Sequence, residues 1–192
     1  SVVSNYLLHR YILQATEPDY TKAYDLCTKL HEAQPMNQHL ARLHTQLELL
    51  KNQPANGQKL NSFTVTDTKG NTVTEKQLDG DVNVIVVWAS WNYESQGTLQ
   101  RLRNLQKFLG SSLKVISISV DASPAEGKTI LERDSITWPN ICDGTMWMSP
   151  LLTAHGICSL PANIVMDSEG NIIERNLPNG ELDEKIKKAV NL

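Results

Sequence analysis

The stretch that decides the fold is Val84-Ile85-Val86-Val87-Trp88-Ala89-Ser90-Trp91-Asn92-Tyr93-Glu94-Ser95. It begins as a short apolar, β-branched run, which predicts a buried strand, and it ends in a turn rich in tryptophan. A buried strand that passes sharply into a helix is where open α/β sheets place their chemistry. The helix is predicted from apolar residues that recur on one face, namely Leu99, Leu102, Leu105, Phe108 and Leu109.

Further strands and helices are predicted on both sides of this stretch. A second buried strand over residues 113–120 follows the helix, and a strand–helix–strand unit of this kind predicts a largely parallel central sheet. Residues 162–166 and 172–174 flank a turn and predict a closing antiparallel hairpin. The remaining predictions are short strands at 63–66 and near Val73, and helices over 125–134, 149–155 and 181–190.

Residues 1–54 predict a helical N-terminal segment that is separate from a domain over residues 55–192. The linker Gln53-Pro54-Ala55-Asn56-Gly57-Gln58 lies between them. Apolar residues recur at helical spacing in three parts of the segment, and Pro18 and Pro35 open the second and third helices. We expect this segment to cover part of the domain, or to be the end of a larger region that is missing here.

Four histidines in the N-terminal segment raise the question of a metal site. His39 and His44 are five residues apart, which separates them by roughly 140° around a helix. Pro35 separates His31 from both, and His9 lies in the first helix. We therefore favour solvated histidines and predict neither a metal site nor a cofactor.

Composition excludes several classes of protein. The 192 residues are 40% hydrophobic and carry a formal net charge of −3, which suits one good-sized domain with an appendage. No Lys/Arg-rich block indicates a nucleic-acid or anionic-membrane surface, and no apolar run reaches the ~20 residues of a membrane span. Because the chain opens at Ser1 rather than at a methionine, we expect that a segment preceded it. The oligomeric state is left open.

The tryptophan-rich turn resembles the active-site motif of the thioredoxin-like superfamily, in particular its bacterial TlpA/ResA-type thiol-disulfide oxidoreductase branch. The pattern of that branch runs from a hydrophobic strand through W-A-S-W to C-x-x-C. A second anchor, Ile157-Cys158-Ser159-Leu160-Pro161-Ala162-Asn163, is similar to the cis-proline loop of the family, and a helical insertion like residues 122–155 is usual before it. The resemblance implies an α/β thioredoxin-like fold, in which helices flank a central mixed sheet. It also implies an extracytoplasmic location, periplasmic or membrane-tethered.

The two cysteine positions of the motif hold Asn92 and Ser95. Thiol–disulfide exchange begins with a thiolate, but a carboxamide is no nucleophile at neutral pH and an unactivated hydroxyl forms no disulfide. The family also keeps a buried Asp or Asn six residues before the first cysteine, where Val86 stands. We therefore predict a degenerate active site with no catalytic residue.

Two other chemistries use residues outside the motif. Cys158 lies three residues before Pro161 and is the candidate for an alternative redox thiol, and a Cys142–Cys158 disulfide stays open because sequence cannot set the Cα separation. A serine hydrolase would need Ser95 beside His155 and an acid. No G-x-S-x-G motif surrounds Ser95, so we favour a structural role for it.

Binding is the function that such a site retains. In the family, the residues at the positions of Trp91, Tyr93, Leu160 and Pro161 hold an extended peptide. We predict a non-redox module that binds a peptide or protein partner at this groove. The alternatives are a redox protein that uses Cys158, and a purely structural domain whose groove is covered by its own N-terminal segment or by a missing region.

Overall fold

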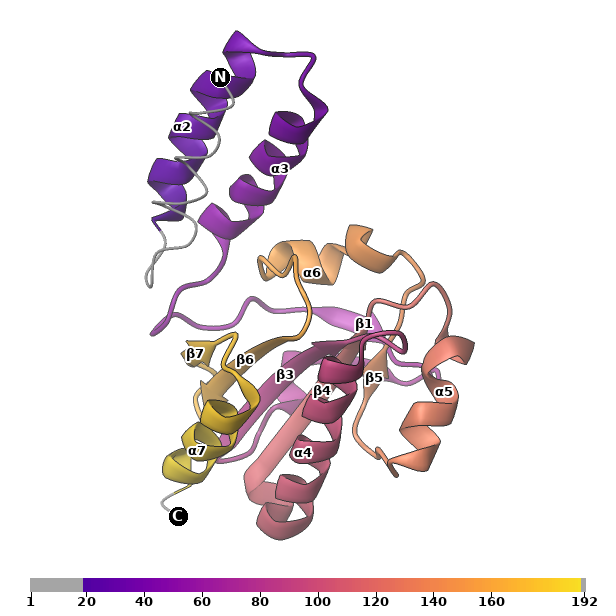
Figure 1. Cartoon of the computed structure of the whole chain (residues 1–192). Helices are drawn as coiled ribbons and strands as arrows, with labels where there is room; N and C mark the ends of the chain where they lie inside the picture. Colours follow the sequence, from indigo (N-terminus) through magenta and orange to yellow (C-terminus); the bar gives the residue numbers. More distant parts are fainter. Residues whose placement is uncertain (1–18, 191–192) are drawn as a thin grey trace. The chain divides into compact units, whose positions relative to one another are not determined.

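The structure, a computed structural model, describes residues 19–190 (Figure 1). These residues form two compact units, which are residues 19–53 with 153–158, and residues 54–152 with 159–190. A division into compact units does not show which part of the chain folds independently. The domain boundary near residue 55 therefore stays a prediction. Among the described residues, no helix is both long enough and apolar enough to cross a membrane.

The first unit contains the helices α2 (Tyr20–Ala33) and α3 (Gln38–Asn52). Asp19 and Asn37 cap them, because each side chain accepts a hydrogen bond from a main-chain N–H in the first helical turn. Apolar side chains from both helices form a small core made of Ala23, Cys27, Leu40, Leu43 and Leu47. The first predicted helix and His9 lie outside the described residues.

The second unit is built on a five-stranded sheet with the order β5-β4-β3-β6-β7. The strands β3, β4 and β5 are parallel, whereas β6 is antiparallel to both β3 and β7. All seven residues of the central strand β3 are buried, as its apolar sequence predicted. The predicted central mixed sheet is confirmed. The strands are β3 (Val82–Trp88), β4 (Leu113–Ser119), β5 (Asn140–Ile141), β6 (Ala162–Asp167) and β7 (Ile172–Arg175).

Helices α4 (Tyr93–Leu109) and α7 (Asn179–Ala189) lie side by side on one face of this sheet (Figure 1). Leu99 and Leu102 of α4 are fully buried there. Phe108, predicted on the same face, is 75% exposed. That prediction was wrong because nine residues separate Phe108 from Leu99, which at 100° per residue places it about 180° around the helix.

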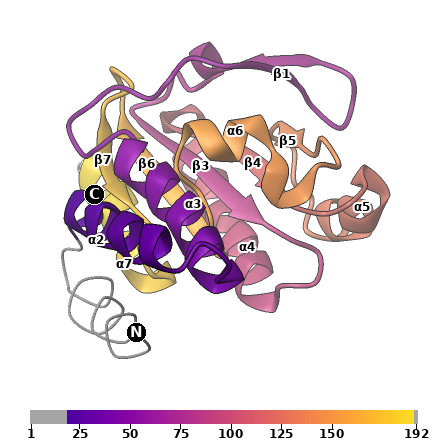
Figure 2. The same cartoon turned by 90° about the horizontal axis from the view of Figure 1, so that it is seen from above.

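The other side of the sheet carries the antiparallel hairpin of β1 (Thr64–Thr66) and β2 (Thr72–Thr74), and Figure 2 shows β1 away from α4 and α7. Residues 122–155, predicted as a helical insertion, contain the helices α5 (Pro124–Arg133) and α6 (Pro150–Ala154), with strand β5 between them. Helix α5 packs closely on the end of β3, since a Cβ atom at Gly127 would lie 2.8 Å from the Trp88 ring. Short 3-10 turns occur at Glu75–Gln77, Gly110–Ser112 and Met146–Met148.

Two hairpin turns of the second unit are built in the same way. Asp67 Oδ1 accepts hydrogen bonds of 2.8 Å from the main-chain N–H groups of Lys69 and Asn71. Asp167 Oδ1 does the same for Glu169 and Asn171, at 2.9 Å. Burial raises the pKa of both carboxyls, but the hydrogen bonds from the turn outweigh it and hold each pKa below its usual range.

Candidate functional site

The tryptophan-rich turn is fixed to the strand beside it by one carboxylate. Asp121 follows β4 and is 1% exposed. Its side chain accepts hydrogen bonds of 2.9 Å from both the main-chain N–H and the hydroxyl of Ser90. From the helix side, Gln96 Nε2 donates to the Ser90 carbonyl at 2.7 Å. Strand β4 and helix α4 therefore hold the turn in one conformation.

Asn92 and Ser95 bond to each other within this turn. The Asn92 side chain caps α4, because its Oδ1 accepts a hydrogen bond of 2.8 Å from the Ser95 main-chain N–H. The Ser95 hydroxyl donates at 2.8 Å to the Asn92 carbonyl and accepts from the Ala89 N–H at 3.2 Å. Ser95 is fully buried, so its oxygen is closed to a substrate.

Two aromatic side chains next to this pair face solvent. Trp91 is 54% exposed and Tyr93 is 88% exposed. Neither side chain has a hydrogen-bond or ring partner among residues 19–190. By contrast, Trp88 is fully buried, and its indole N–H donates to Asn140 Oδ1 at 2.9 Å. The first two aromatic residues are thus available for binding, whereas Trp88 belongs to the core.

The predicted proline loop lies at the same end of the sheet. The Leu160–Pro161 peptide bond is cis, and both residues are half-buried. Val87 pairs with Ala162 across β3 and β6, so the residues that follow Val87 and those that precede Ala162 emerge together. The strand register therefore places the tryptophan-rich turn and the proline loop side by side, although they are far apart in the sequence.

The structure brings together two histidines that the sequence reasoning had separated. Helices α2 and α3 form a hairpin, and the rings of His31 and His44 lie 5.7 Å apart. Thr28 hydrogen-bonds to the His44 ring at 3.0 Å, and both histidines are half-buried rather than solvated. The proline that was expected to keep them apart forms the turn that joins the helices. Within residues 19–190, no cluster of three or more His, Cys, Asp or Glu side chains is arranged to hold a metal ion.

Comparison with known families identifies the domain. The AhpC/TSA family matches residues 56–175, which is more than half of the chain. The chain belongs to the AhpC/TSA family. It is similar to the thiol-disulfide oxidoreductase ResA of Bacillus thuringiensis strain Al Hakam, with 20% identity over 120 residues that cover 62% of this chain and 68% of the relative. ResA of Bacillus cereus strain ATCC 10987 is also 20% identical, over 69% of this chain and 77% of its own.

Solved structures confirm the fold of this AhpC/TSA domain as thioredoxin-like. The C-terminal domain of a proposed thiol-disulfide oxidoreductase from Bacteroides thetaiotaomicron superposes with a TM-score of 0.62 at 28% identity, over 71% of this chain and 97% of that one. The thioredoxin domain of a thiol-disulfide oxidoreductase from Bacteroides vulgatus gives a TM-score of 0.62 at 23% identity, over 71% and 99%. The family assignment is therefore a thioredoxin-like domain related to thiol-disulfide oxidoreductases.

Cys27, Cys142 and Cys158 are all free thiols in the structure of this AhpC/TSA chain. Burial raises the pKa of Cys27, Cys142 and Cys158. A raised pKa lowers the thiolate fraction at neutral pH, and the thiolate is the reactive form. Cys142 donates weakly to the Asp121 carbonyl at 3.5 Å, beside the carboxylate that holds Ser90.

Sequence reasoning missed the roles of Asp121 and Asn140. Asp121 comes directly after the predicted strand over residues 113–120, where no role was predicted for it, yet its side chain fixes the tryptophan-rich turn. Asn140 accepts hydrogen bonds from two buried groups, Trp88 Nε1 and the Ser117 hydroxyl. One sequence signal could have found both residues. Each is a polar residue that lies within or directly after a short apolar run, at the carboxyl edge of a parallel sheet.

Proposed function

We propose that this domain binds an extended peptide or protein segment and does not carry out thiol–disulfide exchange. The observation that carries the proposal is the bonding between Asn92 and Ser95. Their side chains stand where the related motif has its two cysteines, and both are engaged in capping α4 and closing the turn. An amide and a buried hydroxyl in these positions supply neither a nucleophile nor a resolving thiol.

The surroundings of the turn support a binding role. Exposed Trp91 and Tyr93 offer apolar area with free polar groups, the combination that is enriched at binding hot spots. In the cis-proline loop, the main-chain N–H and C=O of Leu160 have no partner among residues 19–190. A free main-chain edge beside exposed aromatic rings suits an extended chain, which pairs through its backbone.

The alternative that Cys158 acts as a redox thiol receives less support. Burial raises the pKa of the Cys158 thiol, and the same holds for Cys142. A redox cysteine needs the opposite environment, with a positive charge or a helix N-terminus that stabilises its thiolate. We also infer from the resemblance that the domain works outside the cytoplasm, and this location stays a prediction.

Reduction of insulin by dithiothreitol tests the loss of exchange chemistry. We expect the protein to leave the uncatalysed rate unchanged, because no low-pKa thiol lies in the turn. A rate above that of dithiothreitol alone would contradict the proposal. Repeating the assay with Cys158→Ser would then show whether that thiol is responsible.

Binding is tested with reduced, carboxymethylated α-lactalbumin, a permanently unfolded chain without free thiols. We expect saturable binding that Trp91→Ala weakens by about tenfold, the effect of removing one aromatic hot spot. Phe108→Ala is the matched control, because Phe108 is an exposed aromatic residue at the far end of α4. No binding, or equal losses in both variants, would instead favour the purely structural domain.

A further inference from the structure

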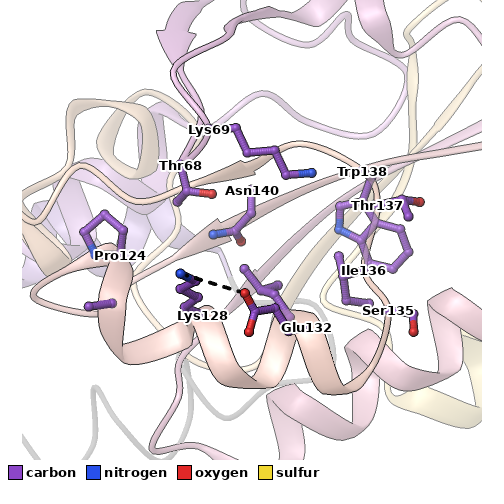
Figure 3. Close-up of a pocket in the computed structure, with 12 residues that line it drawn as sticks. Thr68, Lys69, Pro124, Lys128, Glu132, Ser135, Ile136, Thr137, Trp138 and Asn140 are labelled. Atoms are coloured by element: carbon purple, nitrogen blue, oxygen red, sulfur yellow. Dashed lines mark ion pairs between the residues drawn. The ribbon is translucent and has the colours of Figure 1, made fainter.

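A cavity lies in the same unit as the tryptophan-rich turn, and no residue of that turn lines it. Its volume is about 510 Å³, within the ~300–1,000 Å³ range of small-molecule sites. Three segments line it: the turn after β1, helix α5, and the chain that leads into β5 (Figure 3). Its walls are mainly apolar, and they include Pro124, Ala125, Leu131, Ile136 and Trp138.

One buried polar group faces this cavity without a partner. Asn140 is 5% exposed, and its Oδ1 accepts two hydrogen bonds, from Trp88 Nε1 at 2.9 Å and from the Ser117 hydroxyl at 2.7 Å. Because Oδ1 is engaged on the core side, Nδ2 must point the other way. Among the described residues, no group accepts a hydrogen bond from Nδ2. Figure 3 shows this nitrogen directed toward the space between Thr68 and Lys128.

The apolar wall is fixed by the same network. Trp138 is 5% exposed, and its indole N–H donates to the Ser117 hydroxyl at 3.1 Å, which in turn donates to Asn140. These hydrogen bonds therefore fix the position of the Trp138 indole ring relative to the Asn140 amide. A ligand that contacts both would meet a preformed surface, which reduces the entropy that binding costs.

Two lysines reach the cavity from opposite sides. Lys69 comes from the hairpin turn, whose backbone is held by Asp67, and the turn is joined to β5 by a hydrogen bond of 2.8 Å from Thr68 N–H to the Asn140 carbonyl. Lys128 comes from α5, where it pairs with Glu132 at 3.9 Å, an exposed contact of little strength. Among residues 19–190, no carboxylate lies within salt-bridge distance of the Lys69 ammonium, although Asp67 interacts with it electrostatically. The lining holds the two lysines and one carboxylate, Glu132, and this balance of charge favours an anion.

We propose that this cavity binds a small carboxylate with an apolar, ring-sized body. The carboxylate accepts a hydrogen bond from Asn140 Nδ2 and faces Lys69 and Lys128. The apolar body lies against Trp138, Ile136 and Leu131. This site is independent of the peptide groove, because Trp91, Tyr93, Leu160 and Pro161 do not line the cavity.

Protein NMR with 4-phenylbutyrate as the probe tests the proposal. We expect saturable shifts of the Trp138 indole N–H resonance, while the Trp91 indole resonance stays in place. The neutral analogue 4-phenylbutan-1-ol is expected to bind about tenfold more weakly, because it forms no charge-assisted hydrogen bond. No saturable shift at Trp138, or equal affinity for the alcohol, would overturn the proposal.

Three variants complete the test. Lys69→Ala is expected to weaken binding about threefold, as the loss of one exposed charge interaction does, whereas Lys107→Ala, a lysine of α4 outside the cavity, leaves it unchanged. Ala125→Phe places a ring in the cavity from an exposed position in the first turn of α5 and should abolish binding. Unchanged affinity in both Lys69→Ala and Ala125→Phe would show that the probe binds elsewhere and would overturn the proposal.

Discussion

Ser95 donates its main-chain N–H to the Asn92 side chain, and Ser95 Oγ donates to the Asn92 main-chain oxygen, with both bonds at 2.8 Å. Two hydrogen bonds thus join Asn92 and Ser95 at the start of α4. These bonds make the start of α4 a stable, closed turn. The structural role of Asn92 and Ser95 can therefore be measured as a change in stability when either residue is replaced.

Replacing the cap at Asn92 should affect stability. Asn92→Ala removes the acceptor for the Ser95 N–H and is expected to lower the free energy of unfolding by about 1 kcal/mol. Asn92→Asp keeps an acceptor oxygen and adds a charge that suits a helix N-terminus, so its stability should stay near that of the wild type. Urea unfolding of the three proteins measures the difference. Equal stability of the Ala variant and the wild type would contradict the capping role.

Two helical glycines are expected to respond in opposite ways to alanine. At Gly97 nothing lies within 4 Å of a Cβ atom, so Gly97→Ala should raise the free energy of unfolding by about 1 kcal/mol through helix propensity. At Gly127 the added carbon would lie 2.8 Å from the Trp88 ring, so overpacking in Gly127→Ala should lower the free energy of unfolding by about 1–3 kcal/mol. Thermal or urea unfolding of both variants checks this. A stabilised Gly127→Ala protein would show that α5 moves freely away from Trp88.

Acid should weaken the two hairpin turns. The pKa of Asp67 and that of Asp167 lie below their usual range, so each ionised carboxylate stabilises the folded state above the unfolded-state pKa of about 3.9. That stabilisation is lost as the pH falls through the folded-state pKa. Asp167→Asn removes one titrating group and should make the acid loss of stability shallower. Urea unfolding at a series of pH values from about 6 to 2 measures the slope, and identical slopes would contradict the prediction.

Native thiols should react slowly. Because burial raises the pKa of Cys142 and that of Cys158, their alkylation by iodoacetamide at neutral pH is expected to be slower than that of glutathione. Mass spectrometry of the digested protein assigns the modified site. Reaction of Cys158 faster than glutathione would restore the redox alternative.

Local sequence patterns were sufficient to predict most helices and strands of the thioredoxin-like domain. The apolar run at 84–88, the prolines that open helices and the turn residues of each hairpin act locally, so their effect is readable from neighbours in the sequence. Phe108 shows the limit of this reasoning. Its residue type indicated the core, but its angular position on α4 places it in solvent.

The sequence by itself determined that the turn after β3 carries the amide of Asn92 and the hydroxyl of Ser95 and no thiol, since that depends only on which atoms are present. The tertiary structure decided the rest of the site. Strand register brings the Leu160–Pro161 loop beside the turn, Asp121 fixes Ser90 from another strand, and Asn140 turns its free N–H into a cavity because its oxygen is held by Trp88 and Ser117. These relations join residues that are tens of positions apart, and only the packed sheet sets the distances between them.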